Sequence, residues 1–171
     1  MTRLALLFTL GVAALSASAP GQSFRRNQPA RVVVEAAVAP ITKAAQIVDV
    51  TLTGTPVPGV HVYAPGNPNY LPVTVTVMPV TGLSMGSPIF PEGDDYFFAP
   101  LKESVKVYSK PFVVRVPITV TSAFTRGRTG QPASTVTVKG TVDYQACDDK
   151  VCFPPQSQPF AVDVPVKLAR R

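Results

Sequence analysis

The feature that most constrains the fold is a regular alternation of apolar and polar residues in four separate segments. In the segment 111–121, for example, every second residue from Phe112 to Val120 is apolar. A two-residue period places one side of a segment in a core and the other in water, which is typical of strands in antiparallel sheets. This pattern predicts strands in 71–79, 111–121, 134–144 and 160–168, and less regular strands in 31–39, 44–54, 60–63 and 104–108.

The segments between these strands favour an all-β sandwich. The chain has 19 prolines, and no segment beyond its N-terminus shows a helical period. Pro117 and Pro165 fall within strand patterns, which predicts edge strands or bulges at these two positions. Many short strands with turn-rich connections predict an immunoglobulin-like, antiparallel β-sandwich of two sheets. Two connections, 64–70 and 81–103, are expected to be loops.

The N-terminus has the pattern of an export signal. Arg3 precedes the apolar run 4–17, and small residues follow at 17–19. The run is too short for an ordinary transmembrane helix, and no later stretch is long and apolar enough to span a membrane. We therefore predict a signal peptide over 1–21 and one domain over 22–171, exported to the periplasm or the medium. Cysteines can form disulfides in those compartments.

The net charge of +6 does not indicate a nucleic-acid-binding protein. Much of the positive charge lies near the two ends of the chain, and basic residues are not interleaved with aromatic residues. A hydrolase site also has little support, because no serine lies in a nucleophile-elbow pattern and His61 is the single histidine.

The only two cysteines, Cys147 and Cys152, lie in the stretch YQACDDKVCFPP. If the four residues between them form a turn, the two cysteines face each other across a hairpin, close enough for a disulfide. Such a bond would close a very short loop and stabilise the fold by only about 2 kcal/mol. Cys147 shares its strand parity with polar residues, which predicts that a partner can reach it. The negative charge of Asp148 disfavours a thiolate at Cys147, so charge alone makes Cys152 the better nucleophile.

Spacing alone leaves three interpretations of this pair open: a structural disulfide, a redox pair, or metal-bound or free thiols. Two cysteines and His61 provide three ligands, whereas a closed zinc site needs four, so no metal is expected. His61 is by itself more typical of a strand histidine than of a catalyst. The aromatic residues of 81–103 either cover a site or fill the core from the side.

At the cysteines the sequence resembles the N-terminal domain of DsbD, the bacterial thiol:disulfide interchange protein. The family pattern has Tyr-Gln-x-Cys, a short insert, and then Cys-aromatic-Pro-Pro. The matching residues here are Tyr144, Gln145, Cys147, Cys152, Phe153, Pro154 and Pro155. The stretches PGVHVYAP and IFPEGDDYFFAPLKESVKVYSKPFVVRVPI are similar to the family's other strands and to its acidic-aromatic loop.

The resemblance implies an immunoglobulin-like sandwich with a redox-active cysteine pair and no cofactor. Electrons would come from a thioredoxin-like donor and pass to an extracytoplasmic disulfide isomerase or a cytochrome c maturation protein. Cys152 would form the mixed disulfide with the partner, and Cys147 would resolve it. An aromatic cap would shield the pair. The residues implied to cap or line the site are His61, Tyr63, Asp95, Tyr96, Phe97, Phe98, Tyr144 and Phe153, with Phe97 or Phe98 over the sulfurs.

The chain also departs from the family pattern. The insert Asp148–Val151 is one residue shorter than in the best-known member, and the aromatic loop is longer. The family's membrane electron-transfer and C-terminal thioredoxin-like domains are not in this chain, so its electrons are expected to come from a separate protein. Besides a thiol-disulfide relay, the sequence leaves open a binding sandwich with a structural hairpin disulfide, or a small-ligand site beneath the aromatic loop.

Overall fold

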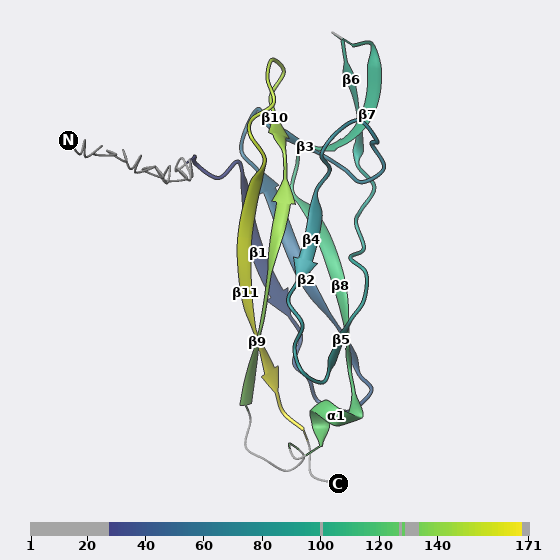
Figure 1. Ribbon diagram of the computed structural model, residues 1–171, viewed down its shortest axis with the longest axis vertical. Helices are drawn as coiled ribbons and strands as arrows, with labels where there is room; N and C mark the ends of the chain where they lie inside the picture. The colour runs from purple at the N-terminus through teal and green to yellow at the C-terminus, as the bar shows by residue number, and fades with distance from the viewer. Residues whose placement is uncertain (1–27, 100, 127, 129–133, 169–171) are drawn as a thin grey trace, which may run out of the picture.

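The structure is a computed structural model that describes residues 28–99, 101–126, 128 and 134–168. In this part of the chain the predicted all-β sandwich is confirmed: two sheets face each other along the long axis, and a third lies at one end (Figure 1). All the sheets pair their strands antiparallel. The predicted signal peptide, 1–21, lies outside the described residues.

The first sheet has the order β1-β2-β8-β5. The second has the order β11-β9-β4, and the third, which we call the end sheet, has the order β10-β3-β7-β6. A single helical turn, α1, follows β8. The bounds are β1 Val32–Val38, β2 Ile47–Pro56, β3 His61–Tyr63, β4 Thr74–Val77, β5 Leu83–Met85, β6 Asp94–Phe98, β7 Glu103–Tyr108, β8 Phe112–Val120, α1 Ser122–Thr125, β9 Ser134–Tyr144, β10 Ala146–Cys147 and β11 Gln156–Val166.

The core lies between the first two sheets and is built by the predicted alternation. Every second residue of β8 is buried: Phe112 is 6% exposed, and Val114, Val116, Ile118 and Val120 are at most 1% exposed. Alternate residues of the second sheet pack against this row from the other side, among them Val138, Val142, Tyr144, Phe160 and Val164. The two-residue period therefore identified the buried face of each long strand.

The two prolines within strand patterns have different settings. Pro165 lies in β11, at the edge of the second sheet, as predicted. Pro117 does not lie at an edge, because β8 lies between β2 and β5. The other predicted setting, a bulge, agrees with the register beside it: Met85 pairs with Ile118 and Ile89 with Arg115, so the segment after β5 has one residue more than β8 between the two pairs. Gly86, just past the end of β5, donates its backbone N–H to the Pro117 carbonyl at 2.7 Å. The N–H that proline lacks would point to the same side as this carbonyl, toward the end of β5. The pairing of β8 with β5 stops there, so few hydrogen bonds are lost.

The segment 81–103 is not a continuous loop. It contains β5, which pairs with β8, and β6, which forms a hairpin with β7. The turn of that hairpin, around Leu101 and Lys102, projects from the same end of the molecule as β10 (Figure 1). Within the described residues, no helix has the length and apolar character required to cross a bilayer.

Candidate functional site

The two cysteines form a disulfide at the base of a tight hairpin turn. Cys147 and Cys152 are antiparallel partners with Cα atoms 4.0 Å apart. Hydrogen bonds flank the pair on both sides: Asp148 N–H donates to the Val151 carbonyl at 2.9 Å, and Phe153 N–H donates to the Ala146 carbonyl at 2.8 Å. The predicted arrangement across a four-residue turn, as a pair not hydrogen-bonded to each other, is confirmed.

The turn holds its shape through a side chain as well as through the bond. The Asp148 carboxylate accepts hydrogen bonds from the backbone N–H groups of Lys150 and Val151, both at 2.8 Å. An aspartate that bonds to the backbone two and three residues later is a common turn-forming element. These two N–H donors, Val151 first, lower the pKa of Asp148. The turn therefore has its own hydrogen bonds, which do not require the disulfide.

The register of the end sheet places the site residues on one face. Residues directly opposite each other in an antiparallel pair project from the same side. Cys147 lies opposite His61, Tyr63 opposite Val107, and Tyr96 opposite Val105. We call this side of the end sheet, with Cys147, His61, Tyr63, Val105, Val107 and Tyr96, the disulfide face.

The other side of the end sheet belongs to the main core. Val62, Tyr108 and Ala146 are buried in the large hydrophobic cluster, whereas Cys147, Tyr63, Val105 and Val107 form a second, smaller cluster. Because the two sides pack against different partners, the site is attached to the sandwich and still lies outside its core.

Aromatic side chains cover the disulfide face. The Tyr96 ring lies 4.5 Å from the His61 ring, and its hydroxyl donates to an Asp149 carboxylate oxygen at 3.1 Å. This hydrogen bond joins the β6–β7 hairpin to the disulfide turn. Tyr70 stacks on Tyr63 with ring centres 4.2 Å apart and donates to Glu103 at 2.7 Å, which raises the pKa of Tyr70 to about 12.

The two cysteines differ in accessibility. Cys147 is 2% exposed, and Cys152 is exposed. The prediction that a partner can reach Cys147 is therefore wrong. The prediction of the side of the strand from which Cys147 projects was correct. Cys147 projects away from the main core, as its parity indicates, but the second aromatic and apolar cluster covers that side. The disulfide therefore joins an exposed cysteine, Cys152, to a buried one, Cys147.

Burial also affects the titrating groups of the disulfide face. Burial lowers the pKa of His61, and the charges of Asp149 and Asp148 oppose this shift. Burial is likewise the main cause that raises the pKa of Tyr63. Burial, followed by the hydrogen bond to Asp149, raises the pKa of Tyr96. His61 therefore stays neutral around neutral pH, and both tyrosines stay protonated.

Two of the residues expected in the cap project from the opposite side of β6. Asp95 lies opposite Lys106, with the carboxylate 3.0 Å from the Lys106 ammonium group. Phe97 lies opposite Ser104 and is 62% exposed. Phe98 has the same parity as Tyr96 and is half-buried. The structure thus brings Tyr96 to the disulfide turn, and the capping role stays a prediction for Tyr96 and Phe98.

Tyr144 and Phe153 lie beside the hairpin and face away from the sulfurs. The Tyr144 hydroxyl accepts from the backbone N–H of Val32 at 3.1 Å and donates to Gln156 at 2.8 Å. The Phe153 ring lies under the Arg31 guanidinium at 3.9 Å, a cation–π contact. Both residues of the recognised motif anchor the hairpin to the sandwich.

Several residues of the site were not predicted from the sequence. Asp149 accepts the Tyr96 hydroxyl, and Gln145 joins the hairpin arms by donating to the Phe153 carbonyl at 3.1 Å. Tyr70 comes from a segment that was expected to be a plain loop. The sequence DDK between the cysteines is a turn signal, but the partner of Asp149 depends on the position of β6.

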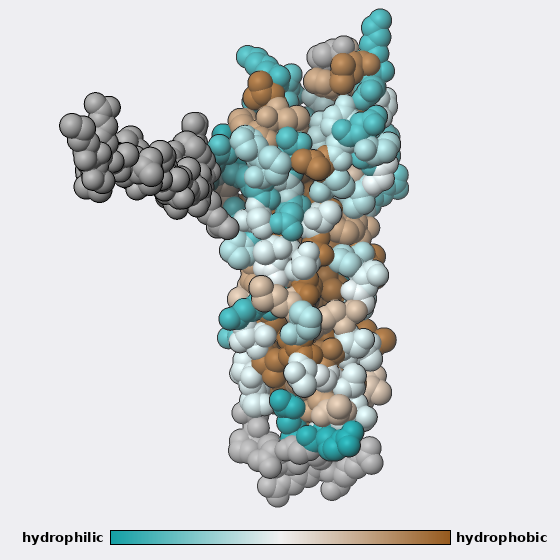
Figure 2. Space-filling view, viewed as in Figure 1, coloured by the Kyte–Doolittle hydropathy of each residue, from teal (hydrophilic) through white to brown (hydrophobic). Residues whose placement is uncertain are grey.

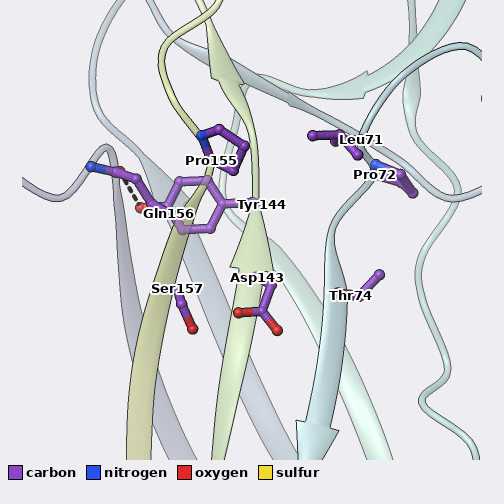
Figure 3. Close-up of a pocket in the computed structure, with 8 residues that line it drawn as sticks. All are labelled: Leu71, Pro72, Thr74, Asp143, Tyr144, Pro155, Gln156 and Ser157. Atoms are coloured by element: carbon purple, nitrogen blue, oxygen red, sulfur yellow. Dashed lines mark hydrogen bonds between the residues drawn. The ribbon is translucent and has the colours of Figure 1, made fainter. Parts of the chain in front are cut away.

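A groove of about 320 Å³ lies at the base of the hairpin, on the outer side of the second sheet (Figure 3). Thr74, Asp143 and Ser157 are cross-strand partners and form its floor. Neither cysteine lines it, and it does not lie beneath the aromatic residues of β6. The lining residues are Leu71, Pro72, Thr74, Asp143, Tyr144, Pro155, Gln156 and Ser157.

The end of the molecule that carries the site also presents apolar side chains to solvent. Figure 2 shows apolar residues on both projections at this end. Val151 in the disulfide turn is 54% exposed, and Leu101 in the β6–β7 turn is 58% exposed. Exposed apolar residues around a reactive group are typical of a protein-docking surface. Among the described residues, no group of three or more histidine, cysteine or acidic side chains could hold a metal ion.

The comparison with protein families agrees with the site. A family model described as "Thiol:disulfide interchange protein DsbD, N-terminal" matches residues 28–164. No curated protein sequence matches the chain. The matched range includes both cysteines and every strand described above, except the last two residues of β11. The chain therefore belongs to the family of DsbD N-terminal domains, which are extracytoplasmic thiol:disulfide interchange domains.

Proposed function

We propose that the protein is an exported relay that passes electrons between a thioredoxin-like donor and an extracytoplasmic disulfide protein through Cys147 and Cys152. The acceptor class is a disulfide isomerase or a cytochrome c maturation protein, as in the family that the chain resembles. The observation that carries the proposal is the unequal exposure of the two cysteine residues, with Cys152 exposed and Cys147 buried beside it.

The exchange proceeds through a mixed disulfide. A thiolate of the reduced donor attacks Cys152, the Cys147–Cys152 bond breaks, and Cys147 leaves with the electron pair. The second donor thiol then releases Cys152, so the domain gains two electrons and the donor becomes a disulfide. The same steps in reverse reduce the acceptor. No cofactor takes part in these steps.

The main alternative is a binding sandwich in which the disulfide only stabilises the hairpin. Two hydrogen bonds to Asp148 stabilise the turn in addition to the disulfide, and neither cysteine belongs to the main core. The bond encloses so short a loop that it stabilises the fold by about 2 kcal/mol. This small contribution favours a bond that is made and broken.

We expect the disulfide to be reduced in moderately reducing buffer while the fold survives. In glutathione or dithiothreitol redox buffers, the midpoint should lie above about −300 mV, whereas structural disulfides usually lie below that potential. The free energy of unfolding, measured by urea denaturation, should fall by no more than about 2 kcal/mol on reduction. A variant with both cysteines changed to alanine serves as the control for the reduced state. A bond that resists these buffers, or a fold lost on reduction, would favour the structural alternative.

The cap can be tested on the buried sulfur alone. In a Cys152→Ser background, Tyr96→Ala should speed alkylation of Cys147 by iodoacetamide several-fold, because the Tyr96 ring lies on the disulfide face. Phe97→Ala is the matched control, since Phe97 is the next residue on β6 and projects from the opposite side. Equal alkylation rates in the parent and Tyr96→Ala proteins would remove Tyr96 from the cap.

A further inference from the structure

His61 is the cross-strand partner of Cys147, and this placement puts an imidazole beside a thiol. The two residues lie directly opposite each other in the pairing of β3 with β10. Side chains of directly opposed residues leave the same face with Cβ atoms about 4.5–5.5 Å apart. His61 is 6% exposed, and Cys147 is 2% exposed. A titratable ring and a thiol therefore share one covered face, away from bulk water.

In the proposed exchange, the buried thiol of Cys147 must lose its proton before it can react. Only the thiolate attacks a disulfide, and apolar surroundings raise the pKa of a thiol. Cys147 is surrounded by Tyr63, Val105 and Val107, so it has little access to a base from solvent. The carboxylates of the adjoining turn, on Asp148 and Asp149, already accept hydrogen bonds: Asp148 from two backbone N–H groups and Asp149 from the Tyr96 hydroxyl.

We propose that His61 is the proton acceptor for Cys147, and that it generates the thiolate that resolves the mixed disulfide on Cys152. This inference rests on the proposed function. The neutral imidazole takes the Cys147 thiol proton. The Cys147 thiolate attacks the Cys152 sulfur, the Cys147–Cys152 bond forms, and the bond between Cys152 and the partner sulfur breaks. The partner leaves as a thiolate with the electron pair, and the imidazolium returns its proton to solvent or to that thiolate.

The surroundings of His61 suit a neutral base. Its ring contacts Tyr63 edge-on at 5.7 Å and Tyr96 at 4.5 Å. β7 presents valines on this face, and Lys106 projects from the other side, where it pairs with Asp95. Burial lowers the pKa of His61, so the imidazole is free to accept a proton at neutral pH. The charges of Asp149 and Asp148 stabilise the imidazolium once it forms, and they oppose the effect of burial.

The test isolates the resolving step with a chromogenic disulfide, dithionitrobenzoic acid. The reduced protein releases a first thionitrobenzoate in a second-order phase, when Cys152 forms the mixed disulfide. It releases a second thionitrobenzoate in a first-order phase, when the Cys147 thiolate displaces the thionitrobenzoate that is bound to Cys152. We expect His61→Gln to slow the first-order phase at pH 7 by about tenfold or more, while the second-order phase changes little. The wild-type rate should level off above the pKa of His61, whereas the variant rate should keep rising with pH as the thiol itself ionises.

Two further measurements separate a proton-transfer role from a structural role. Imidazole added to His61→Ala should restore part of the lost rate, because it enters the space that the ring left and acts as the base. Tyr108→Phe is the control, since Tyr108 lies on β7 with its side chain in the main core. A pH profile that His61→Gln leaves unchanged would overturn the inference and leave the relay standing. A reduced protein that shows no first-order phase at all would instead count against the relay.

Discussion

Reduced Cys147→Ser is expected to accumulate a stable mixed disulfide, and reduced Cys152→Ser is not. The reason is the unequal exposure of the two cysteine residues. Cys152 is exposed at the end of the hairpin, whereas Cys147 is 2% exposed and covered by the aromatic cluster. A partner disulfide can meet Cys152, and without Cys147 no thiol within the domain can displace the bound partner.

The measurement is intact-protein mass spectrometry after incubation with oxidised glutathione. At equal times the glutathionylated fraction of Cys147→Ser should exceed that of Cys152→Ser by about tenfold or more, because burial raises the thiol pKa and blocks approach to Cys147. Alkylation of Cys147→Ser before incubation should abolish the adduct. The same variant, used on an extract of the exporting compartment, should capture protein partners through Cys152. A larger adduct fraction in Cys152→Ser would reverse the two roles.

The sandwich was predictable from the sequence because strand burial depends on a local two-residue period. In β8 and β9 the predicted apolar rows are the rows that pack in the core. The hairpin at the cysteines was equally predictable, since a four-residue turn fixes which residues oppose each other. Local spacing also predicted correctly that Cys147 projects away from the main core.

The cover over Cys147 was not predictable, because it depends on contacts between distant segments. β6 approaches the site through its pairing with β7, and Tyr96 then meets Asp149 more than fifty residues away. The acidic and aromatic composition of 94–98 indicated a loop, and no local pattern distinguished Tyr96 from Phe97 on the two sides of the strand. The family resemblance implied that Tyr144 lines the site, whereas its hydroxyl accepts a hydrogen bond from the backbone N–H of Val32 in β1.

Tyr144→Phe is expected to lower the free energy of unfolding by about 1–3 kcal/mol and to leave thiol exchange unchanged. The Tyr144 hydroxyl accepts from the backbone N–H groups of Arg31 and Val32, at 3.3 and 3.1 Å. It donates to Gln156 at 2.8 Å, a bond that is dashed in Figure 3. Gln156 in turn accepts from Arg31 N–H at 3.1 Å and donates to the Pro29 carbonyl at 3.1 Å. Removing the hydroxyl leaves the N–H of buried Val32 without its partner, which costs more than the loss of a solvent-exposed bond.

Urea denaturation of the oxidised proteins measures the loss of stability, and Tyr70→Phe is the matched control. The Tyr70 hydroxyl bonds Glu103 at 2.7 Å near the surface, where water can replace the lost partner, so its removal should cost well under 1 kcal/mol. Thionitrobenzoate release from reduced Tyr144→Phe should keep both phases at the wild-type rates, because the Tyr144 side chain packs in the main core and not on the disulfide face. A Tyr144→Phe protein of normal stability but slow exchange would place Tyr144 in the redox chemistry after all. The role of this tyrosine in the family motif would then be in electron transfer, and not in anchoring β9 and β11 to β1.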